Sequence, residues 1–315
     1  VMVLDSAQFL INGKNKGEMD VLQIDATLRK EYELFARDTI QPYFKKHVLN
    51  LSTDTGYCDL ELRFKFEVID KPNKLQLVLE EPEKYIIFVN GRRLPITKAG
   101  DWVDSCFERV ALPTTYLVEG ENEICLTTKY SDELQIEPIY LIGDFGVKIS
   151  KKNDGEVNQI IALPKKLTLG DITKQGLPYY GGKIYYFLSL EKGYYKISFP
   201  GHKTFAYAKL KSADKDKIVA FAPYTVEKKV GKAERDYTRC DSVKTADVYE
   251  MREIEGVQIE VGLTRRNTFG PLHYKFKKGE YATPYEFEPD KENYSKRKVL
   301  QKSGLIELRI EKLVK

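Results

Sequence analysis

A strict alternation of apolar and polar residues begins near residue 56. Between Cys58 and Val68, six apolar side chains alternate with charged ones. A period of two places the apolar side chains on one face of an extended chain, as in a half-buried antiparallel strand. Residues 75–79 and 85–89 continue the pattern, and Asn90-Gly91 is a pair favoured in hairpin turns. We therefore predict hairpin-connected strands in this half of the chain.

The second half repeats this plan. Alternation returns over residues 184–190, 257–263 and 305–313, and a Gly-containing turn precedes an expected strand at 194–199. The lead-in sequences QPYF (41–44) and LPYY (177–180) correspond loosely, which indicates a diverged duplication of one unit. Many short strands with turns between them predict an all-β protein of two tandem antiparallel β-sandwiches of the jelly-roll type.

The N-terminal part follows a different pattern. Residues 1–4 and 21–24 have the composition of short strands, and Asp25 suits a helix N-cap. Leu28, Tyr32 and Phe35 then lie on one face of a short helix. This is the one helix that the pattern predicts.

These elements suggest a domain plan. We predict an N-terminal extension at 1–37, a first sandwich at 38–147 and a second at 148–315, with residues 139–147 as the link between the sandwiches. Residues 228–248 and 277–298 are weakly periodic and polar, so a long loop and a surface-wrapping segment are expected there.

Composition is that of a globular protein. The chain has 315 residues, of which 42% are hydrophobic, and it is rich in Tyr (21) and Phe (15), which favour strands. No apolar run is long enough for a membrane helix, and the first ten residues lack the order of a signal peptide. We expect the chain to be part of a longer protein. The cysteines are widely spaced without a CxxC pair, which argues against zinc and redox sites.

Charge divides unevenly along the chain. Residues 1–150 carry 18 Lys and Arg against 25 Asp and Glu, a net charge of −7, whereas residues 151–315 carry 33 against 22, a net charge of +11. The two halves could attract each other, or the basic half could meet an acidic partner. The basic residues are dispersed and form no stripe interleaved with aromatics, so nucleic-acid binding is not expected.

Three stretches together carry a family resemblance. They are LVLEEPEKYIIFVNG (77–91) with WVDSCF (102–107) and EGENEICL (119–126), then IYLIGDFGV (139–147), then QGLPYYGGKI (175–184) with TRRNTFGPLH (264–273). In this order they resemble the galactose-binding-like jelly-roll region at the C-terminus of large, mostly gut-bacterial glycoside hydrolases. Such regions are related to the family-2 sugar-binding domain and to rhamnosidase-like enzymes. The resemblance spans residues 1 to about 305 and departs from the pattern at 228–248.

The resemblance implies a catalytic barrel preceding these domains. Nothing in this sequence resembles a (β/α)₈ barrel, so the implied catalytic carboxylates are expected elsewhere. Glycoside hydrolysis needs two carboxylates at a fixed separation. Glu80, Glu81, Glu83, Asp101 and Asp104 are candidates by residue type alone. No catalytic residue is therefore assigned.

Aromatic residues supply the first candidate carbohydrate contacts. Trp102 is the single tryptophan, and an exposed indole ring would offer a platform for the apolar face of a sugar. Its strand-like context with Phe107 favours core packing instead. Tyr179 and Tyr180 lead into a tyrosine-rich strand and could line a sugar cleft. Packing of these rings along the edge of the core is the favoured alternative.

The string at 264–273 supplies the remaining candidates. Arg266, Asn267 and His273 could line a shallow edge that binds a sugar or a uronate, since a guanidinium group forms bidentate bonds with carboxylates. A buried network of arginine and carboxylates that ties a loop to the sandwich is the preferred interpretation. No cofactor is expected, although a structural calcium ion at Asp144 is an open alternative that jelly rolls of this type allow.

These observations predict a non-catalytic accessory region of a glycoside hydrolase. Its expected partners are carbohydrate or the catalytic domain of the same chain, with no nucleic acid and no membrane span. An independent carbohydrate-binding module and a structural or adhesion pair without sugar affinity are the alternatives. The parent protein is expected to be a bacterial periplasmic or secreted enzyme of polysaccharide degradation.

Overall fold

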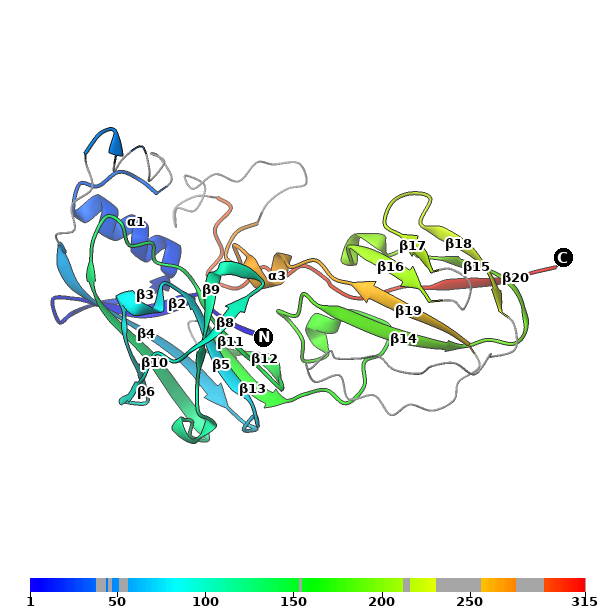
Figure 1. Ribbon diagram of the computed structural model, residues 1–315, viewed down its shortest axis with the longest axis horizontal. Coiled ribbons are helices and arrows are strands. Elements are labelled where there is room, and N and C mark those ends of the chain that lie inside the picture. Colours follow the sequence, from blue (N-terminus) through cyan, green and yellow to red (C-terminus); the bar gives the residue numbers. More distant parts are fainter. Residues whose placement is uncertain are drawn as a thin grey trace. The chain divides into compact units, whose positions relative to one another are not determined.

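The computed structural model describes residues 1–37, 44, 47–50, 56–152, 155–211, 216–230, 256–275 and 292–314. The chain forms two compact units (Figure 1). Unit 1 comprises Val1–Leu163 and Pro271–Val299, and unit 2 comprises Pro164–Gly270 and Leu300–Lys315. Each unit contains two sheets in which almost every strand pair is antiparallel. The predicted all-β class with two β-sandwiches is confirmed.

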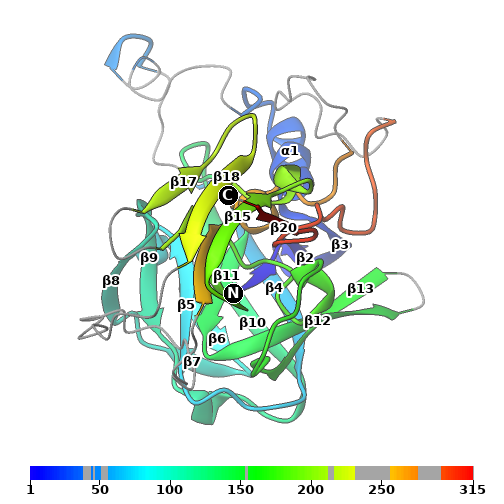
Figure 2. The same ribbon diagram turned by 90° about the vertical axis from the view of Figure 1, so that its right-hand side faces the viewer.

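The first sheet of unit 1 has five strands in the order β1-β11-β5-β9-β8. Figure 2 gives a second view of these strands. Leu75, Leu77 and Leu79 on β5 are buried on one face, and Val78 between them is also buried on the other. Both faces of this sheet are therefore covered at its centre. The strands are β1 (Met2–Leu4), β11 (Ile139–Gly143), β5 (Leu75–Glu80), β9 (Asp104–Ala111) and β8 (Lys98–Trp102).

The second sheet of unit 1 has eight strands. Its long strand β4 has alternating buried and more exposed side chains along its whole length, so the strand predicted from the alternation is confirmed. The pairing of β4 with β13 is parallel, and the other pairs are antiparallel. The strands are β2 (Ser6–Ile11), β3 (Lys14–Asp20), β4 (Cys58–Val68), β6 (Ile86–Val89), β7 (Arg92–Leu94), β10 (Gly120–Tyr130), β12 (Phe145–Lys152) and β13 (Gly155–Ala162). This unit also contains two short 3₁₀ helices, η1 (Pro82–Lys84) and η2 (Thr114–Tyr116).

The N-terminal helix begins earlier than the sequence pattern predicts. Helix α1 spans Val21–Glu31, so the predicted strand at 21–24 is wrong. Asp20 is the N-cap, because its carboxylate accepts a hydrogen bond from Leu22 N at 2.7 Å. The predicted N-cap Asp25 lies inside the helix, where it is 1% exposed and pairs with Arg29. Phe35 lies beyond the helix and is 49% exposed. The short apolar run before Asp25 fits a strand or a helix turn equally well, and contacts with the sheet decide between them.

Unit 2 is the smaller sandwich. Its four-stranded sheet has the order β14-β19-β16-β17, and its three-stranded sheet has the order β18-β15-β20. Ile184, Ile197, Ile259 and Leu305 are among the fully buried residues of its hydrophobic core. The elements are η3 (Ile172–Lys174), β14 (Lys183–Ser189), β15 (Gly193–Ser198), η4 (His202–Thr204), β16 (Tyr207–Leu210), β17 (Lys217–Val219), β18 (Thr225–Val230), β19 (Gly256–Gly262), α3 (Arg266–Phe269) and β20 (Arg309–Leu313). The predicted closing strand at 305–313 is shorter in the structure, where β20 begins at Arg309, pairs with β15 and is mostly exposed.

The compact units differ from the predicted domain boundaries. Residues 1–37 are no separate extension, because β1 pairs with β11 and β2 pairs with β4 inside unit 1. Residues 139–147 are no linker, because they contribute strand β11 and the start of β12 to the two sheets of that unit. The chain returns to unit 1 at Pro271–Val299 after building most of unit 2. A local pattern cannot reveal such long-range pairing. Most of the predicted loop at 228–248 and of the segment at 277–298 lies outside the described residues.

Candidate functional site

The hairpin of β8 and β9 positions the single tryptophan. Trp102 ends β8 and pairs in register with Asp104 at the start of β9. Val103 between them has φ 69, a left-handed conformation that a β-branched residue rarely adopts. Its side chain is 47% exposed, so packing does not require valine there. The tight turn at Val103 fixes the direction in which the indole leaves the strand.

Three aromatic rings meet at this hairpin, and we call Trp102, Phe107 and Tyr140 the Trp102 cluster. The centroid of the Trp102 ring lies 5.3 Å from that of Tyr140 and 6.2 Å from that of Phe107. Phe107 and Tyr140 meet edge to face at 5.5 Å. Trp102 and Phe107 are half-buried, so part of each ring reaches solvent, while Tyr140 is 3% exposed. The cluster is therefore a supported aromatic surface rather than a closed core.

Strand register explains why the rings of Phe107 and Tyr140 share a face. Tyr140 lies opposite Val78, and Phe107 lies opposite Glu80 two residues further along the same strand. Directly opposed residues point to the same side of a sheet, as do residues i and i+2 of one strand. This side carries Val78, Glu80, Phe107 and Tyr140. It is opposite to the side that carries Leu75, Leu77 and Leu79.

Burial, and then nearby carboxylates that include Glu137 and Glu80, raise the pKa of Tyr140 in the Trp102 cluster. Burial raises the pKa of Glu80, and burial also raises the pKa of Glu137 to about 7 although Arg37 opposes the shift. The Arg37 guanidinium forms an ion pair with Glu137 and donates to the Ile136 carbonyl at 3.3 Å. A rigid ring surface next to carboxylates and a guanidinium can stack on a sugar ring and exchange hydrogen bonds with its hydroxyls.

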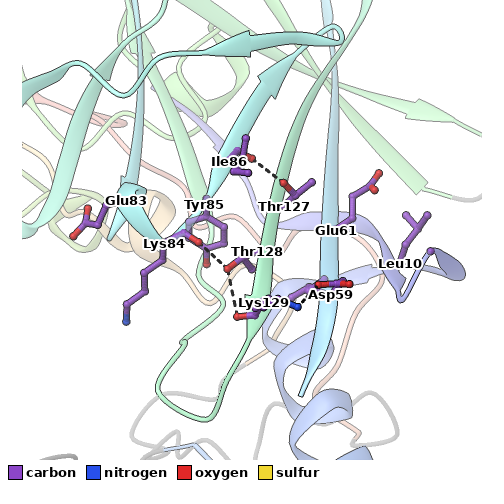
Figure 3. A pocket seen from close by; sticks show the side chains of 12 residues that line it. Leu10, Asp59, Glu61, Glu83, Lys84, Tyr85, Ile86, Thr127, Thr128 and Lys129 are labelled. Atoms are coloured by element: carbon purple, nitrogen blue, oxygen red, sulfur yellow. Dashed lines mark hydrogen bonds and ion pairs between the residues drawn. The ribbon is translucent and has the colours of Figure 1, made fainter. Parts of the chain in front are cut away.

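A shallow hollow of about 490 Å³ lies on the other sheet of unit 1. Figure 3 shows Glu83 and Glu61 on opposite sides of its lining, with Tyr85 between them. Its polar groups already have partners within the chain. Thr128 Oγ1 donates to the Lys84 carbonyl at 2.7 Å, and Lys129 pairs with Asp59 at 2.9 Å. Because Tyr85 is only 8% exposed, the hollow offers little aromatic surface.

His273 lies in a buried charged network of unit 1, which we call the Asp5 network. His273 Nε2 is 3.3 Å from Asp5 Oδ2, and Lys298 Nζ forms an ion pair with Asp5 Oδ1. These side chains are only 6% to 7% exposed. Burial favours protonation of Asp5, but Lys298 and His273 outweigh it and hold the Asp5 pKa well below its usual range. Burial would lower the pKa of His273, but Asp5 raises it. The network ties residues 271–299 to β1 and β2, which is a structural role.

Tyr179 and Tyr180 in unit 2 both form hydrogen bonds with other residues of that unit. Tyr179 is fully buried, and its carbonyl accepts a hydrogen bond from Thr268 Oγ1 at 2.8 Å. The Tyr180 hydroxyl donates to the Lys183 carbonyl at 3.0 Å, and its ring covers Gly182, where a Cβ atom would overlap it. Both tyrosines therefore support the strand that follows them.

Arg266 and Asn267 lie on the short helix α3 of unit 2. The Asn267 amide donates to the Gln301 carbonyl at 2.7 Å and accepts from Gln301 N at 2.9 Å, so it pairs with a segment 34 residues away. Arg266 is half-buried, and burial lowers its pKa. The six predicted contact residues are therefore divided between the two units. Of these, the structure places Trp102 in a supported aromatic surface.

Sequence reasoning missed Tyr140, Arg37 and Glu137. Tyr140 belongs to a segment interpreted as a linker, although the short apolar run Ile139, Tyr140 and Leu141 is compatible with a strand buried on both faces. Arg37 and Glu137 are separated by 100 positions, and no local signal connects them.

Asp144, the candidate calcium ligand, accepts hydrogen bonds from Lys74 N at 2.8 Å and Asn73 Nδ2 at 3.2 Å. Within the described ranges, no group of three or more His, Cys, Asp or Glu side chains is arranged to hold a metal ion. No helix among the described residues is long and apolar enough to cross a membrane.

Comparisons with known proteins give little guidance. No protein-family model matches the chain, and no curated protein matches it. Among solved structures, the pilus backbone (RrgB) from Streptococcus pneumoniae is similar at a TM-score of 0.21 and 7% identity. The match covers 81% of this chain and spans half of the pilus chain. At this level of similarity it supports no conclusion about fold or function.

Proposed function

We propose that this chain is a non-catalytic, carbohydrate-contacting accessory region of a glycoside hydrolase. The observation that carries the proposal is the Trp102 cluster, in which Trp102 and Phe107 remain half-exposed and pack on the buried ring of Tyr140. Sugar recognition in shallow sites combines a held aromatic face with groups that bond to hydroxyls. Glu80 and the ion pair of Arg37 with Glu137 supply such groups beside the rings. The sequence resemblance supplies the enzyme class.

The alternative is a structural pair of sandwiches without sugar affinity. Its support comes from the other predicted contact residues. Tyr179 is fully buried, Asn267 bonds to the backbone of Gln301 within unit 2, and His273 belongs to the Asp5 network of unit 1. If these residues were representative of the whole chain, all of its polar and aromatic clusters would serve stability alone.

The proposal is tested by titrating the protein with neutral and acidic polysaccharides while following tryptophan fluorescence, backed by affinity electrophoresis. Trp102 is the single tryptophan, so its emission reports the proposed site directly. We expect one or more saccharides to change the emission, and Trp102→Ala to weaken their binding roughly ten-fold, about 1.4 kcal/mol. Trp102→Phe retains a ring and should keep part of the affinity.

The matched control is Tyr116→Ala. Tyr116 is also half-buried in unit 1 but lies in η2 beneath Arg92, with the Arg92 guanidinium 5.9 Å from its ring centroid. Binding that survives Trp102→Ala but not Tyr116→Ala would contradict the assignment. The absence of binding to every polysaccharide would favour the structural alternative.

A further inference from the structure

The outer face of the four-stranded sheet in unit 2 carries a second set of aromatic and charged groups. On β14, Ile184 and Tyr186 are buried in the core. Lys183, Tyr185 and Phe187 alternate with them along the strand and therefore point outward. The register places Tyr185 opposite Glu260, Glu260 opposite Lys209, and Lys209 opposite Ile218. We call the outward residues Lys183, Tyr185, Phe187, Tyr207, Lys209, Lys211, Ile218 and Glu260 the tyrosine face.

The ring of Tyr207 lies flat against this face because the residue opposite it, Gly262, has no side chain. Its register partner is Gly262, and a Cβ atom on Gly262 would overlap the Tyr207 ring. The Tyr207 hydroxyl donates to Glu260 Oε1 at 2.8 Å, which fixes the other end of the ring. Tyr207 remains half-exposed. A ring that lies along a sheet and is anchored at both ends presents a preorganised stacking surface at little entropic cost.

A buried carboxylate lies at the centre of this outward face. Glu260 is 5% exposed, and its carboxylate lies 3.5 Å from Lys183 Nζ and 3.8 Å from Lys211 Nζ. Burial alone would raise its pKa, but the Tyr207 hydroxyl and the two lysines outweigh burial and lower it. Glu260 is therefore ionised at neutral pH, and it positions Tyr207 and the two ammonium groups around itself.

The charge of the face is positive. Lys183, Lys209 and Lys211 contribute three positive charges, while Glu260 and Asp216, the partner of Lys209 at 2.7 Å, contribute two negative charges. The balance of +1 leaves cationic groups next to a stacking ring. Lys183 has 58% of its side chain exposed, which leaves it able to meet a ligand.

Exposed apolar side chains flank the charged centre. Phe187 on β14 is 51% exposed and Ile218 on β17 is 66% exposed. These strands are the two edges of the sheet, so they lie about 14 Å apart at the usual strand spacing. A flat surface of this width, with rings and lysines, matches a short saccharide segment that carries negative charge.

We propose that the tyrosine face binds acidic polysaccharide through uronate residues. The rings of Tyr207 and Phe187 stack on sugar rings, Lys183 and Lys211 pair with uronate carboxylates, and Glu260 orients the groups around it. This proposal rests on the carbohydrate-binding function proposed above and adds a second site, on unit 2, with a defined ligand charge.

The test uses the whole chain and polygalacturonate, with dextran as the neutral probe, in affinity electrophoresis and calorimetry. Phe187→Ala and Lys183→Gln change exposed side chains and should leave the fold intact. Each is expected to weaken polygalacturonate binding about three- to ten-fold. Phe221→Ala and Lys192→Gln remove groups of the same kinds that are also exposed but lie outside the face, and these variants should bind like the parent protein. Binding should also weaken as salt is raised from 0.05 to 0.5 M, roughly in step with the shortening of the Debye length.

Comparison with Trp102→Ala separates the two proposals. Polygalacturonate binding that persists in Trp102→Ala and falls in Phe187→Ala supports the tyrosine face. If it falls only in Trp102→Ala, the tyrosine face is overturned and the Trp102 cluster stands. If the Phe187 variant loses binding while Trp102→Ala changes binding of no saccharide, the Trp102 cluster fails and the tyrosine face stands. Tighter binding of an oligothymidylate through Phe187 and Lys183 would assign the face to nucleic acid and overturn the saccharide proposal.

Discussion

Replacing Lys298 by methionine should destabilise unit 1 strongly and in a pH-dependent way. Lys298 and Asp5 form an ion pair in which each side chain is 7% exposed. Lys298→Met leaves the Asp5 carboxylate buried with His273, at 3.3 Å, as its remaining charged neighbour in the Asp5 network. Removing one partner of a buried ion pair costs about 3–5 kcal/mol, because the other charge stays desolvated.

The pH dependence follows from His273. Asp5 raises the pKa of His273, so the imidazolium form is favoured in the folded state. Stability from this interaction is fully present below the unfolded histidine pKa and is lost as pH rises through the folded pKa. In Lys298→Met the imidazolium is the partner left for Asp5. The variant should therefore lose about 3–5 kcal/mol at pH 8.5 and clearly less at pH 5.

Urea unfolding followed by tryptophan fluorescence measures this loss in the right unit. Trp102 is the single tryptophan and lies in unit 1. With an m-value of about 2 kcal/mol/M, the midpoint should fall by about 1.5–2.5 M at pH 8.5. Lys296→Met is the matched control, since Lys296 is exposed two positions away. Asp5→Asn in the Lys298→Met background should restore part of the loss. A loss below about 1 kcal/mol, or an equal loss at both pH values, would refute the reasoning.

Three further predictions use the same unfolding assay. Burial raises the pKa of Asp20 to about 6, so folding becomes less favourable as pH rises through the window from 3.8 to about 6. Asp20→Asn should therefore stabilise the protein by about 2–3 kcal/mol at pH 8 and by little at pH 4. Equal effects at both pH values would contradict this prediction. Val103→Asn should stabilise by about 1 kcal/mol, because φ 69 suits Asn better than a β-branched residue, and a loss would show that the valine side chain packs. Gly143→Ala should destabilise by about 2 kcal/mol, because its Cβ would overlap the Lys74 carbonyl oxygen, and an unchanged midpoint would mean that the strand can shift.

Gly143 shows how a residue in a predicted link can belong to a sheet in the structure. It lies in the stretch 139–147 that the sequence indicated as the link between the sandwiches, whereas in the structure it ends β11 within a sheet and its missing side chain makes room for the backbone near Lys74. Proximity to Lys74 depends on the pairing of β11 with β5. Pairing over more than 60 positions leaves no local trace in composition or period.

The candidate sites show the same division. Trp102 could be named from the sequence because tryptophan is rare and chemically suited to sugars. Its partner Tyr140 could not, because their contact joins β8 and β11, which are distant in the sequence and not neighbours in the five-stranded sheet. Tyr207 and Gly262 likewise become a stacking surface only when β16 and β19 pair.

The sequence by itself determined the all-β class and the strands of strongest alternation, such as Cys58–Val68. Alternation is a local property, because each side chain in a strand points opposite to its neighbour. The tertiary structure alone decided that the strands within residues 1–37 join the sheets of unit 1, that α1 begins at Val21, and that Pro271–Val299 returns to unit 1. It also decided that Asp5, His273 and Lys298 meet in one buried network. These outcomes depend on which distant segments bury each other's apolar surface and charges, and that choice is made by the whole fold.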